Sequence, residues 1–314
     1  MQDIFPSIIG QEAAKKRLSF YVENYASSRF VPNMLFIAPR GCGKTTLAKA
    51  LAKNLVSFEK DSVEPKDYIE INCGQIRNLK HFLTVIITRY VHDKEVTLLF
   101  DEASELPQDV QMGLLTMVNP NSEMMNEFFF EDSSFLFNFK RQTFLFATTE
   151  AHKLFPALVD RLTRIDLAEY SSSELARILQ LKSPTVKYED GLPMTISSVL
   201  RGNGRQAQLM ANDIVTYTKG KGVSKFSNND WSIFKDRLNI APLGLSAIEL
   251  QVLKILNAEG PCTLTNLSAK TLLSKECLQR DIEMVLLKLG LLSITTAGRM
   301  ITVKGRSYLK NLTF

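Results

Sequence analysis

The sequence predicts an α/β protein: a doubly wound parallel sheet, then a helical segment, then a terminal three-helix unit with a two-stranded wing. Short apolar runs alternate with helical stretches up to residue 165, which is typical of a parallel sheet covered by helices. The chain then turns helical and mixed, and a polar stretch over residues 219–230 predicts a surface connection. From Pro242, three helical stretches precede two short β stretches around Ala297 and Gly298, which predict the wing.

Length and composition set broad limits. A chain of 314 residues is too long for one small domain and suggests two or three. The net charge of +5 permits a nucleic-acid partner and equally fits a basic enzyme without one. The four cysteines lack the spacing of a zinc site, and no apolar run approaches the roughly 18 residues of a membrane span. We therefore expect a cytoplasmic protein with no membrane partner.

Four apolar runs predict the strands of the buried sheet. They cover residues 34–38 (MLFIA), 68–72, 96–100 (VTLLF) and 144–147. Helices are expected over residues 12–26, where apolar side chains fall roughly on one face, and over residues 44–55.

A glycine-rich loop between the first strand and the next helix carries the strongest chemical signal. Its glycines let backbone N–H groups approach phosphates, and the helix N-terminus adds a positive dipole. Lys44 would reach the β- and γ-phosphates of ATP, and the Thr45 hydroxyl would coordinate Mg²⁺. Ala38 stands where such loops usually begin with glycine. The predicted nucleotide contacts in this loop are Pro39, Arg40, Gly41, Cys42, Gly43, Lys44, Thr45 and Thr46.

Two acidic residues directly follow the third strand. An acid at the end of a buried parallel strand would lie beside the phosphate loop. Asp101 would hold Mg²⁺, and Glu102 would polarise the attacking water. The alternative is a solvated acidic pair with no catalytic role.

Three further residues are catalytic or nucleotide-binding candidates. Thr149 follows the fourth strand and could position a water near the γ-phosphate. Arg161 could be supplied to the nucleotide of a neighbouring subunit, or it could form a local salt bridge. Arg205 could reach the nucleotide from the second domain, or it could cap a helix or lie on the surface.

Two aromatic runs flank the polar residues 131–134 and predict a β-hairpin near residues 123–143. An exposed aromatic hairpin is an aggregation liability unless something covers it. The hairpin could pack on its own domain, but we favour a protein partner that binds Phe128, Phe129 and Phe130.

These motifs in this order resemble the AAA+ superfamily and, within it, the RuvB family, whose members drive Holliday-junction branch migration. Residues 41–48 (GCGKTTLA) resemble its Walker A stretch, and Asp101 and Glu102 its Walker B. Ile8 and Ile9 resemble the adenine-side entry segment. Residues 147–149 resemble the sensor 1 region, residues 158–162 the arginine-finger segment and residues 201–205 the sensor 2 segment.

The resemblance implies an architecture and partners. A large ATPase domain over residues 1–168 would be followed by a helical lid over 169–241 and a winged-helix domain over 242–314. The family implies a homo-oligomer, expected to be a hexamer, that works on double-stranded or branched DNA. Its hairpin docks on RuvA, so a RuvA-like junction-binding protein is the expected partner here. Arg299, Lys304 and Arg306 would then contact DNA phosphates.

This chain also departs from the family pattern. Ala103 and Ser104 replace the usual isoleucine and histidine, Glu150 replaces an arginine, and the wing is one basic residue short. A bacterial member or a diverged phage or mobile-element member fits these changes. Two alternatives stay open: a helicase loader or ATP-gated recruitment switch in DNA replication, and an assembly that ATP only holds together.

Overall fold

The computed structural model describes residues 4–57 and 64–312. Two compact units are present, one formed by residues 1–184 and 202–215, the other by residues 185–201 and 216–314. Helix α9 (Gly204–Lys221) begins in the first unit and ends in the second. The three-domain division at residues 168/169 and 241/242 stays a prediction.

The first unit is built on a five-stranded parallel sheet in the order β2-β3-β6-β1-β7. Its strands are β1 (Met34–Ile37), β2 (Asp67–Asn72), β3 (Val96–Asp101), β6 (Gln142–Thr148) and β7 (Thr163–Asp166). The four apolar runs are thereby confirmed as strands. β7 was not predicted, because this edge strand is largely polar and only Ile165 is fully buried.

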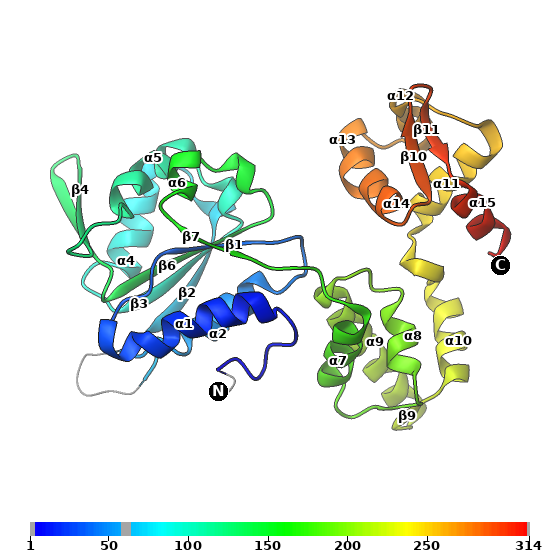
Figure 1. Ribbon diagram of the computed structural model, residues 1–314, viewed down its shortest axis with the longest axis horizontal. Coiled ribbons are helices and arrows are strands. Elements are labelled where there is room, and N and C mark those ends of the chain that lie inside the picture. The colour runs from blue at the N-terminus through cyan, green and yellow to red at the C-terminus, as the bar shows by residue number, and fades with distance from the viewer. Residues whose placement is uncertain (1–3, 58–63, 313–314) are drawn as a thin grey trace. The chain divides into compact units, whose positions relative to one another are not determined.

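Helices cover both faces of this sheet (Figure 1). One face packs against α1 (Glu12–Ser28) and α2 (Lys44–Ala52). The other packs against α5 (Gln108–Met117), α6 (Pro156–Val159) and a continuous helix made of α3 (Leu79–His81), the π-helical turn η2 (Phe82–Ile87) and α4 (Thr88–Tyr90). The short helices η1 (Cys73–Gln75), η3 (Ala103–Glu105) and η4 (Ala151–Lys153) and helix α7 (Ser172–Lys182) complete the unit.

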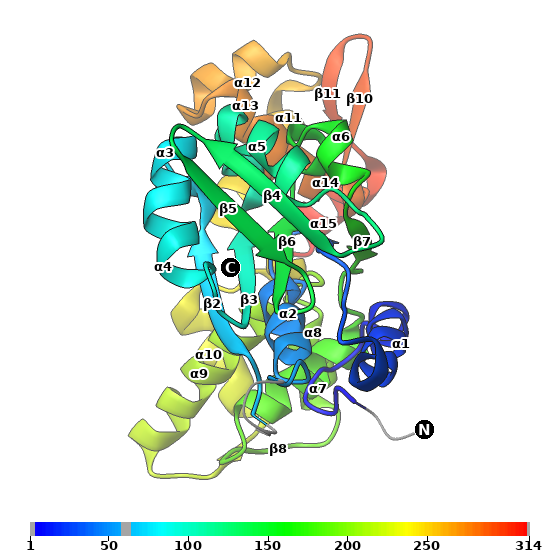
Figure 2. The same cartoon turned by 90° about the vertical axis from the view of Figure 1, so that its left-hand side faces the viewer.

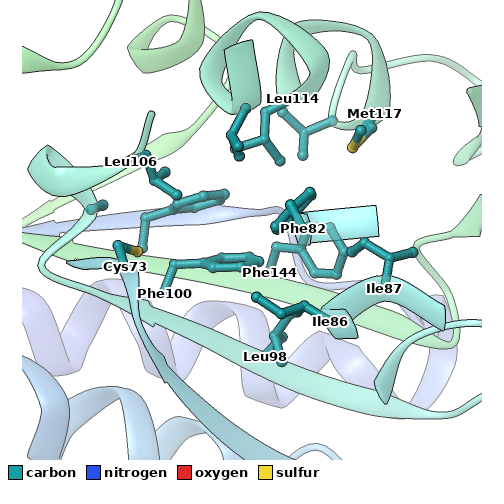
Figure 3. Close-up of a cluster of buried hydrophobic side chains, with 14 of the residues drawn as sticks. Cys73, Phe82, Ile86, Ile87, Leu98, Phe100, Leu106, Leu114, Met117 and Phe144 are labelled. Atoms are coloured by element: carbon teal, nitrogen blue, oxygen red, sulfur yellow. The ribbon is translucent and has the colours of Figure 1, made fainter. Parts of the chain in front are cut away.

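Alternation along the strands sorts side chains between the two cores. Leu98 and Phe100 enter one core, whereas Leu99 between them enters the other. Figure 3 shows Phe100 and Phe144 packed beneath Leu114 and Met117 of α5 and beside Phe82 of η2. Because both faces are buried, β3 and β6 read as continuous apolar runs. This packing fixes the sheet edge at which the functional residues lie.

A hairpin of β4 (Met125–Phe130) and β5 (Ser133–Asn138) lies between α5 and β6 in the sequence. Figure 2 shows both strands in front of α5, against which β4 packs. Inward-facing Phe128, Phe130 and Phe135 pack against the core that holds Phe137. The face that points away carries Met125, Phe129 and Leu136, which are 38%, 70% and 48% exposed.

The second unit contains a small helical group and a winged helix. The helical group consists of β8 (Lys187–Tyr188), α8 (Leu192–Ser197), β9 (Lys225–Phe226) and α10 (Asn228–Leu238). Phe226 is fully buried among the rings of Tyr188, Tyr217 and Phe234. The expectation of a surface connection over residues 219–230 is therefore wrong in part, because β9 pairs with β8 and the buried Phe226 anchors it.

The winged helix follows with its predicted three helices and wing. They are α11 (Ala247–Glu259), α12 (Leu264–Thr271) and a third helix formed by α13 (Lys275–Cys277), the π-helical turn η6 (Leu278–Glu283) and α14 (Met284–Lys288). The turn η5 (Pro242–Gly244) precedes them, and the wing strands β10 (Leu292–Thr295) and β11 (Gly298–Ile301) and helix α15 (Val303–Lys310) follow. Hydroxyl side chains cap α11, α12, α13 and α15, which sets where each helix begins.

Within the described residues no single helix meets the length and hydropathy needed to cross a membrane. One bent pair, Asn228–Gly244 with Ala247–Glu259, meets that requirement only when its two arms are counted together.

Candidate nucleotide-binding site

A cleft of about 600 Å³ opens at the carboxyl edge of the parallel sheet in the first unit. Parallel α/β sheets bind ligands at this edge, because the loops after the strands meet there. The cleft collects most residues nominated from the sequence. Its lining includes Ile8, Ile9, Arg40, Gly41, Gly43, Lys44, Thr45, Thr46, Asp101, Glu102, Thr149 and Arg205.

The phosphate loop runs from β1 to α2 and depends on two glycines. Gly41 has φ 79° and Gly43 has φ 89°, a region that side chains with a Cβ rarely adopt. Ala38 does not have a positive φ, so the alanine at the usual first glycine position is tolerated. α2 begins at Lys44, so its first backbone N–H groups face the cleft.

Two loop residues nominated as nucleotide contacts do not line the cleft. Cys42 is buried and packs in the core beneath the loop, so only its backbone is placed to act. Pro39 also lies outside the lining, although its carbonyl accepts a hydrogen bond from Lys44.

The Lys44 ammonium is held over the loop. Its Nζ donates to the carbonyl oxygens of Ala38 at 2.8 Å and Pro39 at 3.2 Å. An ammonium has three donors, so one remains for a phosphate oxygen. Burial lowers the pKa of Lys44, and the Asp101 carboxylate opposes that shift.

Four polar side chains line the cleft beside the phosphate loop: Thr45, Asp101, Glu102 and Thr149. Thr45 Oγ1 donates to Asp101 Oδ2 at 3.4 Å. Glu102 has a left-handed backbone with φ 54°, unusual outside glycine, asparagine and aspartate, and such strain concentrates at functional sites. Thr149 is exposed to the cleft, whereas Thr148 is buried and accepts a hydrogen bond from the Glu150 amide.

Arg205 enters the cleft from the start of α9, which is attached directly to the phosphate loop. The Gly204 amide donates to the carbonyl oxygen of Gly41 at 2.9 Å. Asn203 Oδ1 accepts from the amides of Arg205 and Gln206 and so caps α9. The segment that carries Arg205 is therefore fixed to the loop that carries Lys44.

Several cleft residues were missed because they belong to no motif read from the sequence. The Gln11 side chain donates to the carbonyls of Cys42 and Ala168 and accepts from the Ala168 amide. Tyr170 lies over the loop, close enough that a Cβ on Gly43 would approach its hydroxyl to 2.6 Å. Burial raises the pKa of Tyr170. Ile178, Leu181, Lys182 and Gln208 complete the same wall.

Arg161 does not line the cleft of its own chain. Its guanidinium instead contacts Asn119 and the Ala157 carbonyl near the end of α6. In this conformation the Arg161 guanidinium therefore does not contribute to the cleft of its own first unit.

Some of the residues nominated as partner or DNA contacts are exposed and others are not. Phe128 and Phe130 face inward and are partly buried, whereas Phe129 faces outward, and their nomination as partner contacts stays a prediction. Arg299 donates to both carboxylate oxygens of Glu283, at 2.9 and 3.3 Å, and its side chain is 16% exposed. This ion pair holds the Arg299 side chain in this conformation, and its nomination as a DNA contact stays a prediction. Lys304 and Arg306 lie exposed on α15.

Comparisons with known proteins agree with this architecture. The model of the ATPase family associated with various cellular activities (AAA) matches residues 34–170, and the model of the RuvB C-terminal winged helix domain matches residues 242–310. The Holliday junction branch migration complex subunit RuvB of Ehrlichia canis (strain Jake) is 26% identical, over 99% of this chain and 93% of that protein. The subunit from Neorickettsia sennetsu is 23% identical, over 97% and 91%.

A solved structure has the same fold. The Thermotoga maritima RuvB Holliday junction branch migration motor aligns with a TM-score of 0.76 and 23% identity, covering 100% of both chains. An AAA module with its phosphate loop and acids in one cleft, followed by a region that matches the RuvB winged helix, makes this chain similar to RuvB proteins over nearly its whole length.

Proposed function

We propose that this chain is an ATP-hydrolysing motor subunit that moves duplex DNA and drives branch migration of Holliday junctions. One observation carries the proposal. The chain joins a phosphate loop, two acids and Thr149 at one sheet edge to a winged helix that matches the RuvB type. Relatives named as Holliday junction branch migration subunits over nearly their whole length support the same conclusion.

In the proposed reaction each cleft residue has one task. Lys44 and the backbone N–H groups around Gly41 and Gly43 bind the β- and γ-phosphates. The Glu102 carboxylate accepts a hydrogen bond from the attacking water and orients it toward the γ-phosphate. The Thr149 hydroxyl, which is exposed to the cleft, positions the same water near the γ-phosphate. Ile8, Ile9 and Tyr170 line the part of the cleft that suits an adenine ring.

Mg²⁺ is the cofactor that this donor set fits. A hydroxyl and a carboxylate within 3.4 Å of each other are hard oxygen ligands of the kind that Mg²⁺ takes beside phosphates. Thr45 would bind the ion directly and Asp101 through water. When bound, the ion would neutralise charge that develops on the phosphates.

The nucleotide site is proposed to be shared between subunits of a ring, most simply a hexamer. Arg205 reaches the cleft from its own chain, whereas Arg161 points away from it. A cation that does not reach the nucleotide of its own subunit can stabilise the hydrolytic transition state only at the nucleotide of a neighbouring subunit. Arg161 is therefore assigned to the γ-phosphate bound by the adjacent subunit.

The DNA contact is proposed on α15 and the neighbouring wing. Lys304 and Arg306 remain as exposed cations after Arg299 is assigned to Glu283, and Lys310 lies on the same helix. Phosphate contacts without base contacts give binding that falls with salt and does not depend on sequence, as a translocating motor needs.

The protein partner is proposed on the outward face of the hairpin. Met125, Phe129 and Leu136 form an apolar surface there that the chain's own core does not cover. A RuvA-like junction-binding protein, in the cytoplasm of a bacterium or of a phage-infected cell, is the partner that the family suggests.

A second candidate is an ATP-gated recruitment switch that loads a replicative helicase. The wing tip favours it, because Thr295, Thr296 and Ala297 carry no positive charge where a DNA motor would contact phosphates. Retention of Glu102 in the cleft argues against the third reading, an assembly that ATP only holds together, because passive binding does not need that acid.

A branch-migration assay separates the first two candidates. The full chain, ATP and a fluorescent four-way junction are combined with the junction-binding protein of the same genome. The motor proposal expects duplex products with ATP and none with a non-hydrolysable analogue. ATP-dependent loading of a replicative helicase without any branch migration would support the second candidate and reject the first.

A further inference from the structure

The Arg161 side chain is held by two hydrogen bonds from two different segments. Its Nε donates to Asn119 Oδ1 at 3.2 Å, and one Nη donates to the Ala157 carbonyl at 2.6 Å. A guanidinium carries five N–H donors, so three remain, all on its terminal nitrogens. The inner part of the group is therefore anchored while its outer end can meet phosphate oxygens in the two-pronged manner typical of arginine.

The orientation of the Asn119 amide follows from chemistry. Oxygen and nitrogen of an amide are hard to tell apart by shape, but a guanidinium has no acceptor. The atom that Arg161 Nε contacts must therefore be the Asn119 oxygen.

Asn119 is itself fixed by a network of amide side chains at the base of the hairpin. Asn126, the second residue of β4, donates to the carbonyl oxygens of Asn119 at 2.8 Å and Met117 at 2.9 Å. Asn121 in turn donates to Asn126 Oδ1 at 2.6 Å and the Met125 carbonyl at 2.7 Å. Pro120 further restricts the backbone of this turn. Asn119 is thus an exposed side chain on a rigid support.

We propose that Asn119 is the positioning residue for Arg161, holding the guanidinium in the orientation in which it meets the neighbouring subunit's γ-phosphate. This inference rests on the proposed shared site. A free arginine on the surface loses rotamer entropy when it is immobilised. The hydrogen bond to Asn119 already restricts the Arg161 side chain, so part of that entropy is lost before the neighbour's nucleotide binds. The effect falls on the hydrolytic step, because the finger acts on charge that develops there.

The test measures steady-state ATP turnover of the assembled full chain with duplex DNA. Asn119→Ala is expected to lower kcat about tenfold and to leave KM for ATP within about twofold, as expected for loss of one hydrogen bond to a charged group. Asn24→Ala is the matched control. It removes an exposed asparagine amide that donates to the Phe20 carbonyl within α1, outside the network that fixes Asn119, and it is expected to change kcat less than twofold.

A double-mutant cycle shows whether Asn119 acts through Arg161. In an Arg161→Ala background, Asn119→Ala is expected to cause no further loss. Independent, multiplying effects, or an equal loss of kcat in Asn24→Ala, would overturn the inference. An unchanged kcat in Asn119→Ala beside a strongly reduced kcat in Arg161→Ala would also reject it while leaving the shared site intact. An unchanged kcat in Arg161→Ala would reject the shared site itself.

Discussion

Arg299 of the wing and Glu283 of the third winged-helix helix form a two-bonded ion pair, with side chains only 16% and 11% exposed. The pair joins β11 to η6 across sixteen residues of sequence. Arg299 also continues the wing through its backbone, which exchanges two hydrogen bonds with Cys262. The basic residue that the sequence places at DNA thus helps to hold the winged helix together.

The first prediction contrasts Arg299 with Arg306. Arg299→Ala leaves a largely buried carboxylate without its partner, which costs about 3 kcal/mol. Amide hydrogen exchange of β10 and β11 in the full chain is expected to accelerate strongly. Arg306→Ala, at an exposed position, is expected to leave exchange unchanged and to reduce the salt dependence of DNA binding by about one unit of slope. Equal exchange in both variants would mean that the ion pair has no structural role.

The second prediction concerns Gly41. A Cβ at this position would lie 1.9 Å from Asn203 Oδ1, and the backbone φ is 79°. Gly41→Ala is expected to push α9 off the loop and to weaken ATP binding at least about tenfold. Gly191→Ala is the control, because its φ is 76° but nothing lies within 4 Å of the added carbon. That variant is expected to lose about 1 kcal/mol of stability and no affinity. Wild-type affinity in Gly41→Ala, measured with a fluorescent nucleotide, would contradict the geometry.

The third prediction separates the two faces of the hairpin. Phe129→Ser changes a ring that is 70% exposed and is expected to shift stability by less than about 0.5 kcal/mol. Phe128→Ser removes a ring that packs on the core, and we expect a loss of about 2 kcal/mol. Capture of the junction-binding protein should fail in Phe129→Ser at a temperature where the variant is folded. Retained capture would move the partner surface elsewhere.

The fourth prediction is a pH dependence at Lys66. This side chain is 3% exposed, and burial lowers its pKa from 10.5 to about 8, with Glu95 opposing the shift. At a pH between these two pKa values the unfolded chain binds more protons than the folded chain, so the free energy of unfolding rises with pH. The Tm of wild type minus that of Lys66→Met is therefore expected to be flat below pH 8 and to increase above it. A difference that stays constant or falls from pH 8 to 10 would show that Lys66 titrates normally.

Much of the fold was predictable because strands that are buried on both faces appear in the sequence as continuous apolar runs. β1, β3 and β6 are continuous apolar runs for that reason, and the phosphate loop follows one of them. β7 escaped prediction because an edge strand needs only one buried side chain, Ile165. The pairing of β8 with β9 escaped because each strand has two residues.

The hairpin faces, the partner of Arg299 and two cleft residues were not predicted, because they depend on information that a single sequence does not contain. Phe128, Phe129 and Phe130 are identical residues, so their run has no alternation to say which face points outward. No sequence pattern near Arg299 predicts that Glu283 is its ion-pair partner. Gln11 and Tyr170 meet the phosphate loop only after folding brings three separate segments of the chain into one cleft.

ATP turnover by the full chain and by Glu102→Gln, with duplex DNA present, tests the central claim most directly. We expect the wild type to hydrolyse ATP faster with DNA than without it. Glu102→Gln is expected to bind ATP within about threefold of wild type and to lose at least about 100-fold in kcat, because a neutral amide cannot take a proton from the attacking water as a carboxylate can. Turnover that survives in Glu102→Gln would contradict the assignment of this cleft as the hydrolytic site of the motor.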